Sequence, residues 1–414
     1  MRSSTHPKNP LKTAGIVLVM AALLAAGLWA ITSRGGLKEA QQKAKAAGIP
    51  TTSAELNPKP GAPAEENAAD LLLSYDLEII SNQSWAKASP AEKERMMAPA
   101  DAKLDALRAV LDKTYLDFNR DWTQHMESLF HEGPVIKSLI KDLTERAKLH
   151  AQQGRTSEAL KDLEVAQHIA HLVHDDVGII GHLVAVAVHR IKDVAFIDVA
   201  TTLRSKGQSV EGLRRLLYRE KFPSLARAVK TEAYLISFTE SLRPLLGGGL
   251  GFEDFRRLYL LEAIKDLESL NKNPDDVLKA AKEIDARFAR VTGGLNLSPG
   301  NLLYSNSRTS FDDLARASLR SVASRQVAGA YLDILAFGAQ KGRFPNDLTE
   351  LGGDRTDPFS GNPLGYSRFE GGFKVWSVDG DGQDDKGLSR QELRRQGAPP
   401  DSKRGDIVAS WRPK

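Results

Sequence analysis

Cysteine is absent from this chain of 414 residues. Its absence excludes disulfide bonds, thiol catalysis and zinc–thiolate sites together, and it leaves the redox compartment undetermined. Several catalytic signatures are absent as well, namely GxSxG, the protein-kinase motifs, the dinucleotide fingerprint and HExxH. The net charge of +4 is mild for this length and gives no reason to expect a nucleic-acid partner. A hydrophobic content of 41% is ordinary for a globular protein, so wholesale disorder is not expected either.

The clearest positive signal is an uncharged apolar run near the N-terminus. Residues 13–32, TAGIVLVMAALLAAGLWAIT, follow a basic segment, residues 1–12, that contains no acid. Twenty residues of helix span about 30 Å, which matches the hydrocarbon core of a bilayer. A cleaved signal peptide usually has a shorter apolar core and a small-residue cleavage site, and the Leu-Trp-Ala ending at Ala30 is a poor one. The pattern favours an uncleaved, single-pass anchor in a bacterial inner membrane, with residues 1–12 cytoplasmic and the bulk of the chain outside the cytoplasm.

The segments that follow the anchor differ in composition. Residues 33–65 are rich in Ala, Lys, Gln, Gly and Pro, which indicates a short basic helix followed by a linker. Residues 66–294 show helical periodicity without strand signals, and Ser89-Pro90 with Glu92 forms a capping box at one helix start. This region is therefore predicted to be an all-α body.

The C-terminal part has a different texture. Residues 295–312 read as a polar, turn-rich connector, and residues 313–414 begin with a long amphipathic helix that Gly342 closes. After this helix come turns, glycines and short runs such as FKVWSV, which are typical of small antiparallel strands. The sequence as a whole predicts a mostly α fold with a small α+β unit at its C-terminal end.

One stretch of the body, residues 143–173, resembles the helix pair of a tetratricopeptide repeat. Small residues occur where that repeat brings two helices close together, and Gly154 ends the first helix. No second clean copy follows at the expected period of about 34 residues, whereas a stable array needs about three. We expect a helical hairpin here, with a superhelical array as the alternative. The matching small and apolar positions are Ala147, Gly154, Ala159, Ala166, Leu143, Leu160 and Leu163.

An acidic loop follows the FKVWSV run. Four aspartates fall within seven residues, and Gly380 and Gly382 between them allow tight curvature. Calcium binds six to eight oxygens from carboxylates, carbonyls and water, and clustered carboxylates repel one another without a counter-ion. A bound structural calcium is therefore one interpretation of the loop, and a solvated acidic turn is the alternative. The four residues are Asp379, Asp381, Asp384 and Asp385.

The order of motifs in the tail resembles the globular domain of the major pseudopilins of type II secretion systems. The likeness covers about 95 residues, and that family has a calcium loop between a strand end and a late Asp-Ile pair. It implies a structural calcium site that involves Ser377 and Asp381 and that Asp406 closes. Together with the clustered aspartates of the loop, the predicted calcium ligands are Ser377, Asp379, Asp381, Asp384, Asp385 and Asp406. The positions that carry the likeness are Gly342, Phe344, Pro345, Asp357, Pro358, Phe359, Gly361, Asn362, Pro363, Ser377, Asp381, Gly382, Asp406, Ile407 and Trp411.

The chain departs from the pseudopilin pattern in two respects. The apolar run contains no Glu and lies about 280 residues before the tail helix, so the likeness does not extend to assembly into a filament. Residues 388–404 are also inserted between the two acidic parts of the loop. The overall layout resembles membrane-anchored bacterial proteins as well, which implies no activity.

An EF-hand is a further interpretation of the loop. Counting Asp381 as position one places Gln383, Asp385 and Glu392 at positions three, five and twelve. Lys386 then stands where the EF-hand requires glycine, and a strand precedes the loop instead of a helix. The predicted residue that closes the calcium site is therefore Asp406 and not Glu392.

Histidines are concentrated between residues 150 and 189. HIAHLVHDD spaces three of them by three residues, which brings neighbours within reach on a helix. A metal site could use His171, His174 and Asp175, and it would make the chain a metal-dependent hydrolase with its site in the helical body. The alternative is partly buried or interface histidines on an amphipathic helix, because Ile169, Leu172 and Val173 alternate with them.

These observations lead to one functional hypothesis and one alternative. The hypothesis is a membrane-anchored, exported scaffold or interaction protein of the bacterial envelope, with a structural Ca²⁺ loop. Its expected partners are the membrane, through residues 13–32, and other envelope or secretion proteins. The alternative is the metal-dependent hydrolase.

Overall fold

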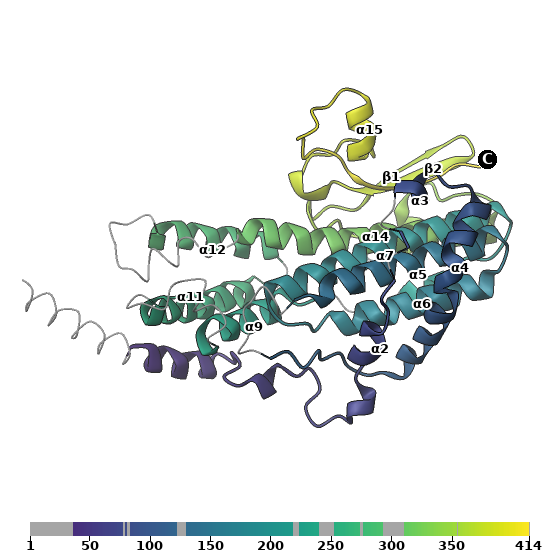
Figure 1. The fold of residues 1–414 in the computed structure, drawn as a ribbon. Helices are drawn as coiled ribbons and strands as arrows, with labels where there is room; N and C mark the ends of the chain where they lie inside the picture. Colours follow the sequence, from purple (N-terminus) through teal and green to yellow (C-terminus); the bar gives the residue numbers. More distant parts are fainter. Residues whose placement is uncertain are drawn as a thin grey trace, which may run out of the picture.

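A bundle of long helices makes up most of the molecule, and a small sheet lies on one side of it (Figure 1). The computed structural model describes residues 36–77, 79–80, 83–121, 130–217, 223–239, 252–273, 276–292, 310–353 and 355–413. The chain is mostly helical, as predicted. The helices are α2 (Ala69–Leu73), α3 (Gln83–Lys87), α4 (Pro90–Ala106), α5 (Glu132–Gln152), α6 (Thr156–Val173), α7 (Gly178–Ser205), α8 (Glu211–Leu217), α9 (Leu225–Phe238), α11 (Phe252–Lys272), α12 (Val277–Thr292), α14 (Phe311–Lys341) and α15 (Arg390–Arg395).

The predicted anchor, residues 13–32, and the segment 1–12 lie outside the described residues. Among the helices that the structure does describe, none combines the length and the apolar character needed to cross a bilayer. The anchor therefore stays a prediction from the sequence.

Helices α5 and α6 form the hairpin that the sequence predicted. Gly154 between them has a φ of 79°, a left-handed conformation that glycine adopts without strain. Ala147 of α5 and Ala159 of α6 are fully buried, and their small side chains allow the helices to pack closely. α7 packs along both helices of the hairpin and shares a core with them through Phe196 and Leu203.

The segment 33–65, which composition indicated to be a linker, is packed on the body in its described part. Residues 36–46 form a helix whose Leu37, Ala40 and Ala44 join the core between α9, α11 and α12. Farther along, the carbonyl of Leu56 accepts a hydrogen bond from Arg227 of α9 at 3.1 Å. The sequence predicted a short helix here but not its packing, which uses alanines spaced three to four residues apart that are small enough to pack tightly against another helix.

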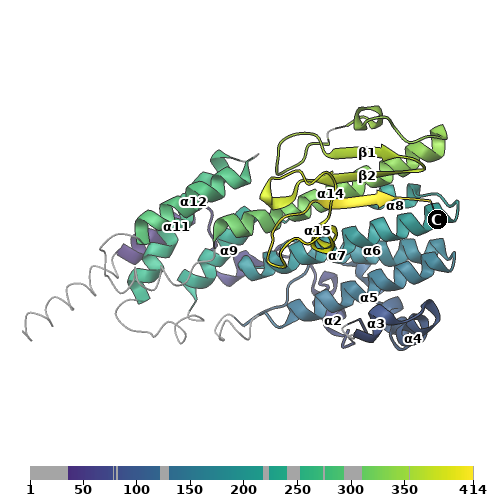
Figure 2. The same ribbon diagram turned by 90° about the horizontal axis from the view of Figure 1, so that it is seen from above.

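Helix α14 connects the body to the tail. Ser310 caps its start by accepting from the backbone of Asp313, and Gly342 ends it in a left-handed conformation with φ 70°. α14 packs along α7 on one side and carries the sheet on the other, so body and tail share one core. Figure 2 shows the strands lying along α14.

The sheet has three antiparallel strands in the order β1 (Gly365–Phe369), β2 (Gly372–Ser377) and β3 (Ile407–Trp411). β2 is the run that the sequence predicted as a strand. Its Phe373 is fully buried, and the ring of Tyr331 from α14 lies 5.4 Å away between centroids. Alternation along β2 and β3 points Phe373, Val375 and Trp411 at α14, which fixes the register of the sheet on the helix.

Candidate functional site

The tail loop, residues 378–389, follows β2 and is fastened at its start by a buried carboxylate. Asp357 is 1% exposed and accepts hydrogen bonds from the hydroxyl of Ser377 at 3.1 Å and from the backbone of Val378 at 2.8 Å. Ser377 is thus engaged with Asp357. The sequence indicated Asp357 only as part of a family motif, and its role in orienting the loop depends on a contact 20 residues away.

Asp379 lies between two arginines. Arg320 of α14 donates to one of its oxygens at 2.6 Å, and Arg390 of α15 donates to the other at 3.4 Å. Its φ of 53° is left-handed, a conformation that aspartate tolerates better than most residues. This predicted calcium ligand therefore joins α14, α15 and the loop by ion pairs.

The carboxylate of Asp406 holds the backbone of the tail loop near Asp385. Asp406 accepts from the backbone N–H groups of Asp385 at 3.3 Å and Gly387 at 2.8 Å. Burial, together with the charges of Asp384 and Asp385, raises the pKa of Asp406 to about 6. The buried Oδ2 of Asp385 has no hydrogen-bond partner in the described part of the chain, while its Oδ1 pairs with Arg404.

The remaining predicted ligands are partly engaged elsewhere. Asp384 accepts from the indole of Trp376 at 2.9 Å and pairs with Lys386 at 2.7 Å. Asp381 accepts from the backbone of Gln383 at 3.0 Å, and its Oδ2 is buried without a partner among the described residues. Within the described ranges, no group of three or more His, Asp or Glu residues is arranged to hold a metal ion. The calcium site stays a prediction.

Two details bear on the EF-hand interpretation. Lys386 has a φ of 59°, which is the left-handed conformation that the EF-hand glycine normally supplies. Glu392, however, is used in a capping box at the start of α15, where it accepts from the backbone and hydroxyl of Ser389 at 2.8 and 2.6 Å. Glu392, at the twelfth position of the EF-hand pattern, is therefore engaged in capping α15.

The structure brings His171, His174 and Asp175 close together and places His182 elsewhere. The rings of His171 and His174 stack with centroids 6.1 Å apart, and Nδ1 of His174 lies 3.4 Å from Asp175. The imidazole of His174 beside it lowers the pKa of Asp175. His182 instead contacts the hydroxyl of Ser318 on α14 at 2.7 Å, and burial lowers its pKa to about 4. The metal-dependent hydrolase stays an untested alternative.

Buried charges in the body are paired with one another. Arg146 of α5 donates to both oxygens of Asp162 on α6. On α7, Asp193 pairs with Lys192 at 3.1 Å and with Arg325 of α14 at 3.0 Å. Burial lowers the pKa of Lys192 to about 7 against the opposing attraction of Asp193. These groups are sealed inside the bundle, so their role is to join helices.

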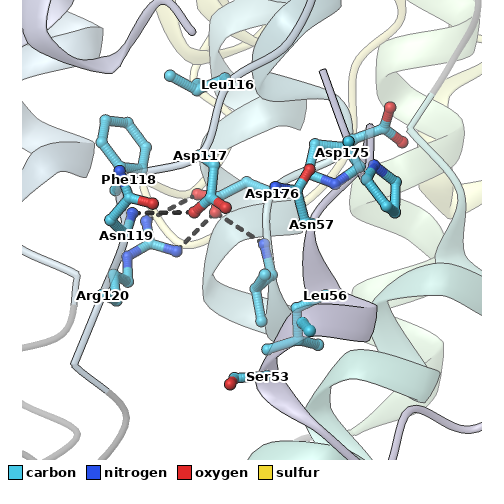
Figure 3. A pocket seen from close by; sticks show the side chains of 15 residues that line it. Ser53, Leu56, Asn57, Leu116, Asp117, Phe118, Asn119, Arg120, Asp175 and Asp176 are labelled. Atoms are coloured by element: carbon cyan, nitrogen blue, oxygen red, sulfur yellow. Dashed lines mark hydrogen bonds and ion pairs between the residues drawn. The ribbon is translucent and has the colours of Figure 1, made fainter. Parts of the chain in front are cut away.

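A cavity of about 460 Å³ opens where three distant segments meet (Figure 3). Its lining comes from residues 53–61, from residues 116–120 and from the turn 175–177 between α6 and α7. Two contacts hold the segments together: Arg227 donates to the carbonyls of Leu56 and Asp175, and Asn67 bonds the backbone of Asp117 on both sides. A cavity of this size is in the usual range of ligand pockets.

Among the lining residues that the structure describes, the only guanidinium is fully used by the protein. Arg120 is 6% exposed and donates to Asp176 at 2.6 and 3.1 Å and to Glu132 at 3.3 Å. The rings of Phe118 and Phe130 lie 4.9 and 4.7 Å from its central carbon and cover it. Arg120 therefore braces the wall of the cavity and is not open to a ligand.

The groups left open in this cavity are mostly hydrogen-bond acceptors. Within the described residues, the carboxylate of Asp117 accepts only from the backbone of Asn119, at 2.9 Å. The side chain of Asp175 is 42% exposed. Asn119 adopts a left-handed φ of 50° beside them, which asparagine tolerates. We call this cavity the acceptor pocket.

Sequence reasoning missed the acceptor pocket. Its acids are spread over residues 117, 175 and 176, and its third wall belongs to the segment interpreted as a linker. One local signal was present: LDFNR at 116–120 interrupts the helical pattern with polar residues around an aromatic one. Comparison with protein-family models, with curated proteins and with solved structures finds no match to this chain.

Proposed function

We propose that the chain is a membrane-anchored, exported scaffold protein of the bacterial envelope that binds other envelope or secretion proteins. The observation that carries the proposal is an apolar face on α7. Ile180, Leu183 and Val194 are 43, 39 and 52% exposed, and they make up three of the five most exposed large apolar side chains in the described ranges. Spacings of three and eleven residues place them on one side of the helix.

The exposed face has the character of a protein contact. Solvated apolar side chains that line up along a helix favour association, because a partner that covers them removes apolar surface from water. Arg190 lies on the same exposed side, within the stretch between Leu183 and Val194. Arginine among apolar groups is frequent at the centres of protein interfaces. The acceptor pocket adds sites for hydrogen-bond donors of a partner.

Crosslinking in living cells tests the proposed contact. A photo-crosslinking amino acid replaces Leu183 or Val194 in the full chain, and Arg215, exposed on α8, serves as the control position. The proposal predicts one discrete crosslinked partner from Leu183 and Val194 and none from Arg215. The same bands at all three positions, or none at any, would contradict it.

The anchor is tested separately by fractionation. The full chain is expected in the membrane fraction and should need detergent for its release, because residues 13–32 supply about 30 Å of apolar helix. A variant that lacks residues 13–32 should remain soluble. A full chain that is washed off by salt or alkali would argue against a spanning anchor.

A structural calcium in the tail loop is part of the same proposal. Its support is the hydrogen bond from the backbone N–H of Asp385 to the carboxylate of Asp406, together with the buried, unpartnered Oδ2 atoms of Asp381 and Asp385. Metal analysis of the full chain purified in detergent should find one equivalent of calcium, which Asp381→Ala and Asp406→Ala remove. Asp401→Ala, at an exposed position in the insertion, is the matched control and should retain it. Absence of calcium from the unaltered chain would overturn this part alone.

A further inference from the structure

A second cavity, of about 500 Å³, lies where the ends of α7 and α14 meet the sheet. The tail contributes Trp411 and Pro413 from the end of β3 and Gly371 from the turn between β1 and β2. The helix ends contribute the remaining lining, namely Arg204, Ser205, Gly338, Gly342, Arg343 and Phe344. We call this cavity the Arg204 pocket. It belongs to neither the tail loop nor the acceptor pocket.

One guanidinium in this pocket is unused. Arg204 has no hydrogen-bond or ion-pair partner among the residues that the structure describes. Arg343 differs, because it pairs with Glu350 at 2.7 Å and lies over the ring of Phe337. The charge of Arg343 is therefore balanced inside the protein, whereas that of Arg204 is not. A planar guanidinium offers parallel N–H donors that match a carboxylate or phosphate.

A second donor lines the same cavity. Trp411 is 7% exposed as a whole, and its indole N–H has no acceptor in the described part of the chain. Buried tryptophans usually satisfy this group, as Trp376 does with Asp384 at 2.9 Å and Trp85 with Glu145 at 3.1 Å. The indole N–H of Trp411 is not used by the described residues and is therefore available to an acceptor that enters the cavity.

Apolar surface surrounds these two donors. The rings of Phe344 and Trp411 and the pyrrolidine of Pro413 form one part of the lining, and glycines form another. A Cβ at Gly342 would meet nothing within 4 Å, so the cavity is open at this point. The lining thus combines a few donors with an apolar remainder, as small-molecule sites do.

We infer that the Arg204 pocket binds a carboxylate carried on a small apolar or aromatic body. The guanidinium of Arg204 and the indole N–H of Trp411 hold the carboxylate oxygens, and the rings of Phe344 and Trp411 contact the apolar body. This inference does not rest on the proposed scaffold function. Arg204 is the specificity residue, because it is the unbalanced charge in the lining.

Fluorine NMR on the full chain in detergent tests the inference. The chain contains five tryptophans, so 5-fluorotryptophan gives few signals, and Trp411→Phe identifies that of Trp411. Phenylacetate is the probe, and phenylacetamide is its neutral counterpart of nearly the same shape. We expect phenylacetate to shift the Trp411 signal saturably at millimolar concentration. Phenylacetamide should bind about tenfold more weakly, because the charge-assisted hydrogen bonds are lost.

Variants locate the charge. Arg204→Gln should abolish the saturable shift, whereas Arg215→Gln, at an exposed arginine of α8 outside the lining, should leave it unchanged. Inorganic phosphate tests whether the pocket recognises the anion alone or also the apolar body. It should compete only weakly with phenylacetate. The inference is overturned if phenylacetate produces no saturable shift, if phenylacetamide binds as well, or if Arg204→Gln binds like the unaltered chain.

Discussion

The two cavities leave charged groups of opposite sign open. In the acceptor pocket, the guanidinium of Arg120 forms ion pairs with Glu132 and Asp176. The carboxylate of Asp117 accepts a single hydrogen bond, from a backbone N–H. In the lining of the Arg204 pocket, Arg343 pairs with Glu350, which lies outside the lining, and the guanidinium of Arg204 has no partner among the described residues. The numbers of acids and bases in a lining therefore do not identify the class of ligand. The charged groups that have no partner inside the protein indicate it instead.

The tail loop extends the comparison to a carboxylate, that of Asp379, which looks free in the sequence and is held by two arginines in the structure. Asp379 stands among glycines and other aspartates, yet two arginines from α14 and α15 hold it. Acidic density along the chain predicted a cation site, and the partners of Asp379 come from 59 residues before it and 11 after it.

The largest effect is expected where a paired charge is removed. Asp379→Asn leaves Arg320 and Arg390 facing each other without a carboxylate, while asparagine keeps the left-handed backbone conformation. Asp379 is 6% exposed, so the free energy of unfolding should fall by about 3 kcal/mol. Denaturant unfolding of the full chain measures it. Asp401→Asn is the control, and a loss below about 0.5 kcal/mol for Asp379→Asn would mean that the pair does not hold the tail.

A smaller, pH-dependent effect is expected at Asp406. Its pKa of about 6 in the folded chain exceeds the value of about 3.9 in an unfolded chain. Without a cation this group contributes most to stability below about pH 4, and its contribution is lost as the pH rises through 6. Bound calcium favours the ionised carboxylate, so it should raise the melting temperature more at pH 7 than at pH 5.

Asp406→Asn isolates that contribution from those of the other carboxylates. The variant should show no such difference between the two pH values, because an amide does not titrate there. An equal effect of calcium at both pH values in the unaltered chain would place the cation away from Asp406.

The smallest effect on stability is expected at Asp117. Asn at this position keeps an oxygen for the backbone N–H of Asn119, so the free energy of unfolding should change by less than about 0.5 kcal/mol. Binding should change instead. Calorimetry with benzylamine should show several-fold weaker binding to Asp117→Asn than to Asp112→Asn, an exposed control outside the pocket. Equal binding to both would remove Asp117 from the acceptor pocket's function.

Local features of the fold were predictable from the sequence. The capping box at Ser89, the hairpin turn at Gly154 and the helix end at Gly342 follow from the residue types themselves. The β2 strand followed from its β-branched and aromatic run. These signals act over a few residues, which is the range that propensity and periodicity cover.

The cavities and their charges were not predictable in the same way. Arg120 forms an ion pair with Asp176, which lies 56 residues later in the chain. Arg204 and Trp411 line the same cavity only because α14 places the sheet at the end of α7. Neither pairing leaves a local pattern in the sequence. The helix at residues 36–46 was missed as a packed element for a related reason, since its alanines are buried only by helices that follow far along the chain.

The central claim is that paired charges hold this fold and unpaired charges are available for binding. Denaturant unfolding of Arg120→Gln and Arg204→Gln in the full chain tests it most directly, because the substitution is the same at both sites. Arg120→Gln should lower the free energy of unfolding by about 3 kcal/mol or more, since Glu132 and Asp176 lose their buried counter-ion. Arg204→Gln should change it by less than about 0.5 kcal/mol. Equal losses in the two variants, or a larger loss for Arg204→Gln, would contradict the account.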